Sequence, residues 1–286
     1  MKKIATLFFF LIAISSVAFS QISNLEKNAL IDLYKSTNGE NWNHTWDLAN
    51  DTNTWYGVTI VNDAVTEINL SMNNLEGTLP SSIGNLKSLQ QLNLGFNKIS
   101  GMFPAEITTI TSLESIQLFM NQLEGELPST IGNLTNLKEL VLFNNLISGT
   151  LPESIYNLKN LEVLHISSNR LSGTISPKIE NLTTLVTLSV FDNAMNGGIP
   201  AQIGNLSNLV ELTLANNSFE GGIPVELNKL SKLEVLLLSN NKFIGQLNNS
   251  IKTLPQLINL EYKNSQDVDA YTQTLNPITH NTLMPQ

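Results

Sequence analysis

The chain has 286 residues, of which 42% are hydrophobic and 14% are charged, and its formal net charge is −9. This composition allows a large buried core and is unlike that of disordered or collagen-like chains. The acidic balance repels phosphate backbones and anionic lipid surfaces, so we expect no nucleic acid and no membrane surface as a partner. The chain has no cysteine, so no disulfide can form and stability must come from packing.

The first segment, residues 1–20, has the pattern of a signal peptide. Two lysines precede an apolar run that ends at Ile14 and is too short to cross a bilayer, and small residues precede an expected cleavage point between Ser20 and Gln21. Loss of the two lysines and no acid takes the formal charge from −9 to −11. No later segment is apolar enough for a membrane span. We therefore expect a secreted protein (extracellular, cell-surface or periplasmic), and the short two-lysine start is typical of bacteria.

Residues 21–64 are expected to form a helical, tryptophan-rich cap. Ser23 is a candidate N-cap for a helix whose apolar residues recur at helical spacing. These residues are Leu25, Ala29, Leu30, Leu33 and Tyr34. Three tryptophans, Trp42, Trp46 and Trp55, then cover the open end of the core that follows. We interpret them as buried packing residues rather than as a platform for stacking sugars.

Residues 65–256 consist of an uninterrupted repeat with a spacing of 24 residues. Its most regular feature is a set of asparagines at Asn73, Asn97, Asn121, Asn145, Asn169, Asn193, Asn217 and Asn241, each followed four residues later by glycine. Counted from the asparagine, positions −8, −5, −3, +2, +6, +10 and +13 are apolar in all eight copies. One copy cannot bury so many apolar groups alone, so the copies must stack into one elongated core. The asparagine side chains are expected to bond to the backbone of each turn.

The copies NNLEGTLPSSIGNLKSL, NQLEGELPSTIGNLTNL and NSFEGGIPVELNKLSKL resemble the plant-type leucine-rich repeat, L-x-G-x-I-P-x-x-I-G-N-L. The resemblance implies an α/β repeat fold: a leucine-rich-repeat solenoid with a concave parallel β-sheet, eight 24-residue repeats and a ninth terminal strand. It also implies a second short strand in each turn, which we expect to be lost in repeats five and eight, where Ser176 and Asn248 replace proline.

The segment before the repeats resembles the N-terminal cap of the same family, in which W-x-G-V is flanked by two cysteines. Trp55, Gly57 and Val58 match the motif, whereas Asn53 and Ile60 stand where the cysteines would be. We expect the cap to survive through its aromatic packing. The resemblance as a whole identifies a plant-type leucine-rich-repeat protein, and the signal segment indicates a bacterial secreted member.

Residues 257–286 are expected to form the last strand, a short cap and a loose tail. Leu257, Leu260 and Tyr262 continue the strand pattern, and Ser265 takes the asparagine position. The rest of the segment is polar and has no periodicity, and such termini tend to fray.

The sequence contains little that indicates catalysis. It has no nucleophile-elbow, zinc-protease or phosphate-loop motif, and its three histidines, His44, His165 and His280, come from remote regions. We therefore predict no metal site, no cofactor and no enzymatic activity. A hydrolase built on polar groups around His165 is the remaining enzymatic alternative.

Large apolar residues break the polar pattern on the outward side of the strands. Phe119 and Phe143 occupy position −2 of adjacent repeats, Phe191 lies two repeats further, and Phe96 and Met120 occupy position −1. Such a cluster has the size of an interaction surface. The alternative is that the rings pack against one another or that the −1 side chains fold into the turn. The predicted ligand-binding set is Phe96, Gln117, Phe119, Met120, Val141, Phe143, His165, Phe191 and Asp192.

These observations favour an exported, non-enzymatic recognition protein that binds a protein, peptide or glycan on the concave face. The resemblance suggests receptor ectodomains and inhibitors of cell-wall polygalacturonases, so an inhibitor of a secreted hydrolase or a surface adhesin is the alternative within the binding class. A structural surface-layer role would instead require self-association.

Overall fold

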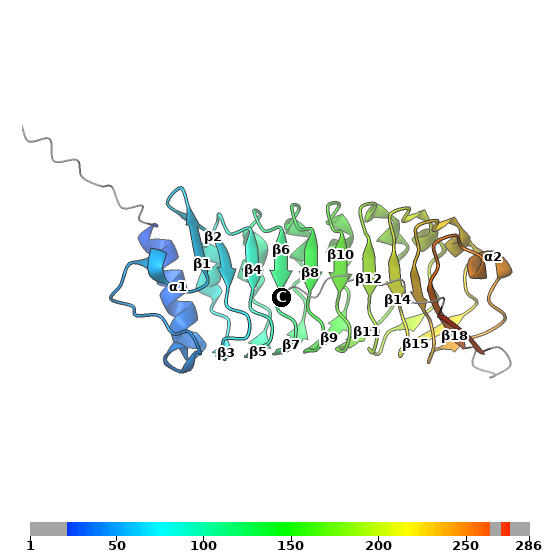
Figure 1. Cartoon of the computed structure of the whole chain (residues 1–286), viewed down its shortest axis with the longest axis horizontal. Coiled ribbons are helices and arrows are strands. Elements are labelled where there is room, and N and C mark those ends of the chain that lie inside the picture. The colour runs from blue at the N-terminus through cyan, green and yellow to red at the C-terminus, as the bar shows by residue number, and fades with distance from the viewer. Residues whose placement is uncertain (1–21, 264–269, 275–286) are drawn as a thin grey trace, which may run out of the picture.

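The computed structural model describes residues 22–263 and 270–274, which form an elongated coil of stacked turns (Figure 1). Each turn supplies a strand to a long sheet, a second short strand to another layer, and a short helical turn that leads to the next repeat. The predicted signal segment and cleavage point, Ser265, and the tail beyond residue 274, with His280, lie outside the described residues.

The long sheet has eleven strands, which are parallel from β2 to β18 and flanked by antiparallel strands β1 and β19. Its register places equivalent residues of successive repeats opposite one another, as in the pairing of Leu140 with Leu164. The strands are β1 (Val58–Val61), β2 (Ala64–Asn69), β4 (Gln91–Asn93), β6 (Ser115–Gln117), β8 (Glu139–Val141), β10 (Val163–His165), β12 (Thr187–Ser189), β14 (Glu211–Thr213), β16 (Val235–Leu237), β18 (Asn259–Lys263) and β19 (Ala270–Thr274). The leucine-rich-repeat solenoid and its ninth strand, β18, are therefore confirmed.

The second layer contains a five-stranded and a three-stranded sheet. Their strands are β3 (Glu76–Thr78), β5 (Lys98–Met102), β7 (Gln122–Glu126), β9 (Leu146–Thr150), β11 (Arg170–Ser172), β13 (Asn196–Gly197), β15 (Ser218–Gly221) and β17 (Lys242–Phe243). The expected loss of this strand in repeats five and eight is wrong, because β11 and β17 are both present. They are only shortened, to three and two residues.

The missing prolines are replaced by side-chain caps. Ser176 is followed by Pro177 at the start of a 3-10 helix, and its side chain accepts a hydrogen bond from the N–H of Lys178. The backbone N–H of Ser176, which proline would lack, donates to the Tyr156 hydroxyl at 3.0 Å. Asn248 likewise caps helix α2 (Asn249–Lys252). The strand survives because its hydrogen bonds are made before the position of the proline.

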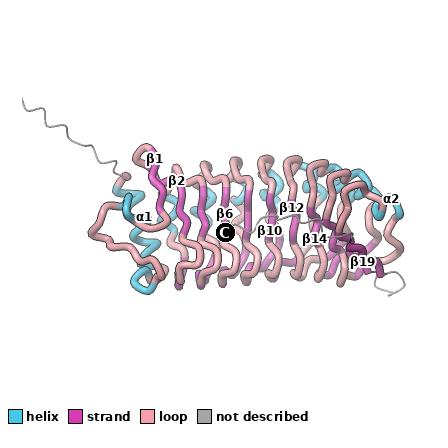
Figure 2. The backbone as a smooth tube through the Cα atoms, viewed as in Figure 1, coloured by secondary structure: helices cyan, strands magenta, loops and turns pink. Residues whose placement is uncertain are grey.

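Short helical turns lie behind the long sheet and close each repeat (Figure 2). They are the 3-10 helices Ser81–Asn85, Ala105–Thr109, Ile131–Asn133, Glu153–Asn157, Pro177–Asn181, Ala201–Asn205 and Val225–Lys229. Between the layers, every apolar position of the repeat is buried except Ile223, which is partly buried. The core is therefore one continuous column, and each turn is stabilised by burying its apolar side chains against its two neighbours.

The cap begins with helix α1 (Asn24–Ser36), whose N-cap is Ser23 as expected. The Ser23 hydroxyl and the Glu26 carboxylate form a capping box, and the other Glu26 oxygen accepts a hydrogen bond from the N–H of Val65 in β2. One buried side chain thus caps the helix and also satisfies the backbone of the sheet. Leu25, which was expected on the buried face, is instead 60% exposed because it lies on the outer side of the first turn.

The tryptophans form the aromatic core of the cap. Trp46 stacks on Trp55 with ring centroids 4.8 Å apart and meets Trp42 edge to face at 4.9 Å. All three are buried, and each indole N–H donates to a backbone carbonyl in the cap. The interpretation of the tryptophans as packing residues is confirmed, and their hydrogen bonds satisfy polar atoms that burial would otherwise leave unpaired. Two short 3-10 helices, Gly39–Asn41 and Thr52–Thr54, complete the cap.

Ser23→Ala should lower the free energy of unfolding by about 1 kcal/mol, because the capping box loses the hydroxyl and α1 is left with an unsatisfied N–H. Chemical denaturation followed by circular dichroism measures the change. Asn28→Ala, on the exposed side of the same helix, is the control. It should be neutral or slightly stabilising because alanine has the higher helix propensity. Equal losses in both variants would contradict the role of the cap.

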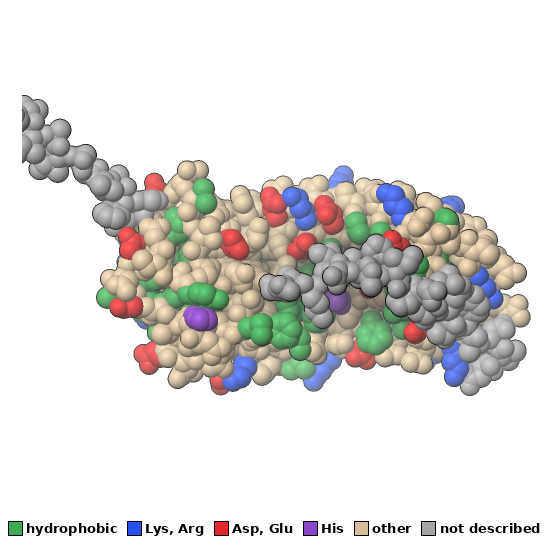
Figure 3. Space-filling model, in the orientation of Figure 1, with side chains coloured by type: hydrophobic (Ala, Val, Ile, Leu, Met, Phe, Trp, Pro, Cys, Tyr) green, Lys and Arg blue, Asp and Glu red, His purple; other side chains and the backbone are tan. Residues whose placement is uncertain are grey.

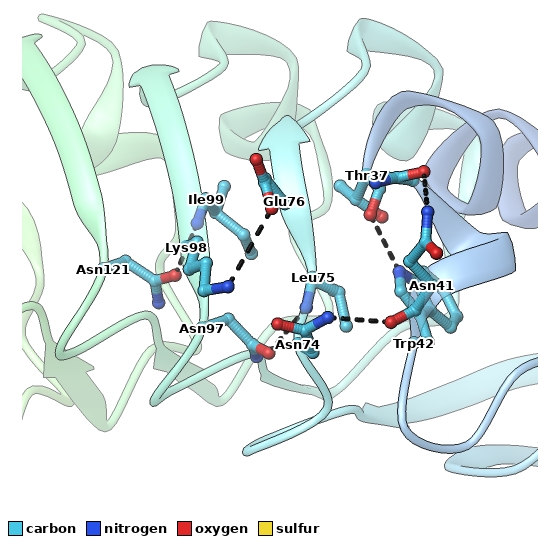
Figure 4. A network of polar contacts seen from close by, with 11 residues as sticks. Thr37, Asn41, Trp42, Asn74, Leu75, Glu76, Asn97, Lys98, Ile99 and Asn121 are labelled. Atoms are coloured by element: carbon cyan, nitrogen blue, oxygen red, sulfur yellow. Dashed lines mark hydrogen bonds and ion pairs between the residues drawn. The ribbon is translucent and has the colours of Figure 1, made fainter.

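The asparagines line the turn after each strand and join neighbouring repeats (Figure 4). The Asn97 side-chain amide donates to the carbonyls of Leu70 and Leu94, both at 2.9 Å, while its oxygen accepts from the N–H of Leu75 at 3.0 Å. Asn121 bonds in the same way one repeat later, with its oxygen accepting from Ile99. The expected role of the asparagines in satisfying the turn backbone is confirmed.

At the C-terminal end, the strand residues Leu260 and Tyr262 of β18 are buried as expected. The expectation of a loose tail is wrong for Ala270–Thr274, because this segment forms β19 antiparallel to β18. Pairing at a sheet edge uses backbone groups, which explains why no side-chain pattern indicated it. In the described part of the chain, no helix has the length and apolar character required to cross a membrane.

Candidate functional site

The outward side of the long sheet, which we call the strand face, carries the candidate site. In each repeat the strand face presents the first and third strand residues and the two residues that precede the repeat asparagine. The intervening residues point into the core, as the fully buried Leu140 does between Glu139 and Val141. In the space-filling view, hydrophobic side chains gather in the middle of this face, and lysine and arginine side chains lie along its rims (Figure 3).

Four rings form a continuous row across adjacent repeats, which we call the aromatic strip: Phe96, Phe119, Phe143 and His165. Phe96 meets Phe119 edge to face, with centroids 5.2 Å apart and planes at 84°. Phe119 stacks on Phe143 at 4.8 Å and 13°, and Phe143 stacks on His165 at 4.6 Å and 24°. The distance between Phe119 and Phe143, which occupy the same position of adjacent repeats, matches the distance of about 4.8 Å between neighbouring strands, so the sheet sets the stacking distance of this pair.

Gly95 makes room for the first part of the strip. A Cβ atom at this position would lie 2.6 Å from the Cζ atom of Phe119, which is too close for any side chain. The Phe119 ring therefore lies over the glycine backbone, and this glycine is required by the ring above it rather than by the turn.

One of the alternatives considered for the apolar residues is observed in the structure. The rings do pack on one another, and Phe119 and Phe143 are only partly exposed as a result. Even so, Phe96 remains 44% exposed at the end of the strip. The stacked faces are covered, and the ring edges form the outer surface.

The structure brings only part of the predicted binding set together. Phe191 lies outside the aromatic strip, because Ser167 occupies the equivalent position between it and Phe143. Gln117 donates to the carboxylate of Glu139 at 3.1 Å, and Glu139 also accepts from Ser115 at 2.9 Å. His165, another member of the predicted set, is the last ring of the strip. The remaining members, Met120, Val141 and Asp192, lie on the same face around the strip.

The residue before each of the eight repeat asparagines adopts a left-handed backbone conformation. In repeats four to eight this position holds Asn144, Ser168, Asp192, Asn216 and Asn240, whereas repeats one to three have Met72, Phe96 and Met120 at φ of 56°, 55° and 51°. Asparagine and aspartate tolerate this region, but a bulky apolar residue there is strained by about 1 kcal/mol. Burial does not compensate Met72, which is 68% exposed. Strain of this kind is typical of functional positions.

Sequence reasoning missed Met72 as a site residue. It occupies the same repeat position as Phe96 and Met120, so the signal was present in the alignment of the repeats. With Phe96 it lines a shallow recess of about 380 Å³ whose other residues are Asn43, Asn74, Asn97 and Lys98. Beside it in the cap, His44 stacks on Tyr56 at 4.3 Å, and Tyr56 is 48% exposed. The apolar surface therefore reaches beyond the strip to the cap.

Met72→Asn should raise the free energy of unfolding by about 0.5–1 kcal/mol, because asparagine relieves the strain of the left-handed backbone at little loss of burial. Thermal or urea unfolding measures the gain. Met102→Asn is the matched control, since Met102 is 70% exposed but lies in the extended strand β5. No gain is expected there, and a loss of stability in Met72→Asn would show that the side chain is held for structural reasons.

Burial beside Phe143 lowers the pKa of His165 below its usual value of 6.5. The folded state therefore binds the proton less readily than the unfolded state does. Its contribution to stability is fully present above the unfolded pKa of 6.5 and is lost as the pH falls towards the folded pKa.

The free energy of unfolding should consequently fall as the pH is lowered from 7 through 6.5. His165→Phe keeps a ring in the strip and removes the titrating group, so its pH dependence between pH 7 and pH 5 should be shallower than that of the wild type. Denaturant titrations at several pH values test this. A pH dependence that is unchanged in the variant would contradict the stacked, desolvated state of the imidazole.

Neither a metal centre nor a catalytic pair is assembled from the described residues. They contain no group of three or more potential metal ligands, and no hydrogen bond joins His165 to a hydroxyl or carboxylate. The hydroxyls nearest in the repeat pattern bond to one another, with Ser167 to Ser189 at 2.6 Å and Thr213 to Ser189 at 2.5 Å. The hydrolase alternative therefore receives no support from the geometry.

Comparison with known proteins finds matches to leucine-rich-repeat families and structures. The family described as leucine-rich repeat region matches residues 144–279, and the family described as leucine rich repeat matches residues 63–123. The leucine-rich-repeat ectodomain of the plant membrane receptor kinase GASSHO1/SCHENGEN3 from Arabidopsis thaliana, solved with CASPARIAN STRIP INTEGRITY FACTOR 2, is 34% identical with a TM-score of 0.79. This chain folds as a leucine-rich-repeat solenoid, and its fold is similar to that of a plant receptor ectodomain. The match covers 82% of this chain but 29% of the ectodomain.

Two further structures show how this leucine-rich-repeat protein relates to others. The plant peptide hormone receptor RGFR1, solved with RGF2, is 31% identical with a TM-score of 0.69, over 71% of this chain and 33% of the receptor chain. A plant ice-binding protein shares the fold, with 22% identity, a TM-score of 0.61, and coverage of 79% of this chain and 89% of that chain. No curated protein sequence matches. The chain thus spans about a third of the two receptor chains that it resembles.

Proposed function

We propose that this protein is an exported, non-enzymatic recognition protein, a bacterial secreted member of the leucine-rich-repeat proteins, that binds an extended peptide on the strand face. The observation that carries the proposal is the aromatic strip, a row of four partly exposed rings on four adjacent repeats. It is flanked by the strained apolar residues Met72 and Met120. Partly exposed aromatic rings of this kind are typical anchors of binding surfaces.

The orientation of the rings favours a peptide over a glycan. A sugar packs on the open face of an aromatic ring, but the faces of Phe119 and Phe143 cover one another. Their exposed edges suit the aliphatic and aromatic side chains of a peptide instead. Receptors of peptide hormones among the similar structures support the same class of ligand. The other partners considered for this surface, a whole secreted hydrolase or a cell-surface glycan, lack a specific observation in their favour.

The length of the ligand follows from the sheet. Eight strands at about 4.8 Å span about 34 Å, which an extended peptide of about ten residues covers at about 3.3 Å per residue. We therefore suggest selecting binders from a random library of peptides of this length on immobilised protein. A Phe119→Ala/Phe143→Ala double variant serves as the counter-selection surface.

The expected result is a set of peptides with apolar residues that bind the wild type and are lost on the double variant. A glycan array probed in parallel distinguishes the other class. If glycans bind and no peptide is enriched, the proposed function is wrong. If peptides are enriched equally on both proteins, the strip is not the site.

A further inference from the structure

The charges of the strand face are of one sign. Across repeats one to eight its outward positions carry Glu67, Glu139, Asp192 and Glu211 but no lysine or arginine. Cations lie beside the face instead, where Lys98 approaches Glu76 at 3.9 Å and Lys138 pairs with Glu114 at 2.7 Å. The arrangement leaves the face itself acidic and aromatic, which is complementary to a basic partner.

Glu211 differs from the other acids of this face. Its carboxylate has no hydrogen bond or ion pair within residues 22–263 and 270–274, whereas that of Glu139 is held by two side chains. Glu211 is only partly exposed, and this burial raises the pKa of its carboxyl group above the usual value. Its neighbours on the adjacent strands are Thr187 and Val235, neither of which can neutralise it.

A half-buried carboxylate without a partner costs free energy, which a cation supplied by a ligand would recover. The hydroxyls of Ser189 and Thr213, the third residues of strands β12 and β14, do not stabilise the Glu211 carboxylate, because they are bonded to each other. A metal ion is a poor fit, because a single carboxylate with no cluster of ligands around it does not form a cation cage. An arginine or lysine side chain needs only one such acceptor.

The aromatic strip fixes where the rest of the ligand lies. Phe143 follows strand β8 and Glu211 begins β14, three strands further along the sheet. Three strand spacings of about 4.8 Å amount to about 14 Å across the sheet, and the four repeat positions between the two residues add about 13 Å along the strands at about 3.3 Å each. The direct separation is therefore about 19 Å, which equals about six residues of extended peptide. A peptide that packs an apolar side chain against Phe143 would therefore bring its sixth residue onwards to Glu211.

We propose that the ligand of the strand face is a basic peptide in which an arginine or lysine pairs with Glu211, about six residues away from an apolar residue that packs on the aromatic strip at Phe143. This inference rests on the proposed function, since it assumes a peptide on this face. It adds the positive charge of the peptide and the direction in which the peptide runs across the repeats. The apolar part lies over the early repeats and the basic part over repeats six and seven.

The test uses the peptides selected on the wild-type protein. Enrichment of arginine or lysine about five to seven residues from an apolar residue is expected. Selected peptides that are apolar but carry no basic residue, or that carry acidic ones, would overturn this inference and leave the proposed function intact. If no peptide is selected, both the proposed function and this inference are wrong.

A double-mutant cycle then assigns the contact. Glu211→Gln should weaken a selected peptide about tenfold, and replacing the basic residue of that peptide by glutamine should do the same, with little further loss when both changes are combined. Glu124→Gln, an identical change on the exposed side of strand β7 in the second layer, is the control and should leave affinity unchanged. If the two effects are independent, the basic residue binds elsewhere and the assignment to Glu211 is wrong.

Discussion

Asn145→Ala is expected to destabilise the protein by about 3–5 kcal/mol, the largest effect of any single polar substitution proposed for this chain. The Asn145 side-chain amide donates to the carbonyls of Leu118 and Leu142, both at 3.0 Å, and its oxygen accepts from the N–H of Leu123 at 2.9 Å. All three backbone groups are buried, so alanine leaves them without partners.

The position of Asn145 also affects the cooperativity of unfolding. It lies in the fourth of eight repeats, and the amide joins that repeat to the one before it. Because each turn contacts only its neighbours, weakening one interface can separate the unfolding of the two halves. Urea unfolding followed by circular dichroism should therefore show a lower midpoint and a broader transition.

Asn133→Ala is the matched control for this prediction. Asn133 lies in the preceding helical turn, is exposed, and makes no side-chain hydrogen bond in the part of the chain that the structure describes. Its loss should change the free energy of unfolding by less than about 0.5 kcal/mol. If Asn145→Ala proved equally mild, water would have to replace the asparagine amide. The asparagine side chains that join the repeats would then not be the source of stability proposed here.

The fold could be predicted from the sequence because every repeat has the same pattern of apolar residues around its asparagine. The spacing of the asparagines fixes the register of the sheet, and the apolar positions fix the core, as Leu140 opposite Leu164 illustrates. The errors arose where backbone hydrogen bonds decide the structure. Strand β19 pairs without an apolar pattern, and β11 persists although Ser176 replaces proline.

The candidate site could be predicted only in part, because repeat alignment gives the column of a side chain but not its rotamer. It placed Phe119 and Phe143 on neighbouring strands, but the stacking of His165 on Phe143 depends on how the rings turn. The strain at Met72 is likewise a property of the backbone angle φ, which the sequence does not reveal unless the left-handed position of the repeat is known.

The second large expected effect concerns binding. Phe119→Ala or Phe143→Ala should each reduce the affinity for a peptide selected on the wild-type protein by about 2 kcal/mol or more, because anchors at the centre of a desolvated contact commonly dominate the binding energy. Phe119 is in contact with two rings of the strip, so its removal also frees Phe96 and Phe143 to move.

Because the rings are in contact, the affinity losses of the single and double variants should not be additive. The double variant should lose less than the sum of the single losses, because either substitution already breaks the stack on which the ligand packs. Isothermal titration calorimetry measures all three variants, with circular dichroism to show that each is folded. Ile244→Ala is the control, since Ile244 is 54% exposed but lies away from the strand face, after β17 of the second layer. Additive losses would mean that the rings act as separate contacts, and unchanged affinity in both single variants would place the ligand elsewhere on the solenoid.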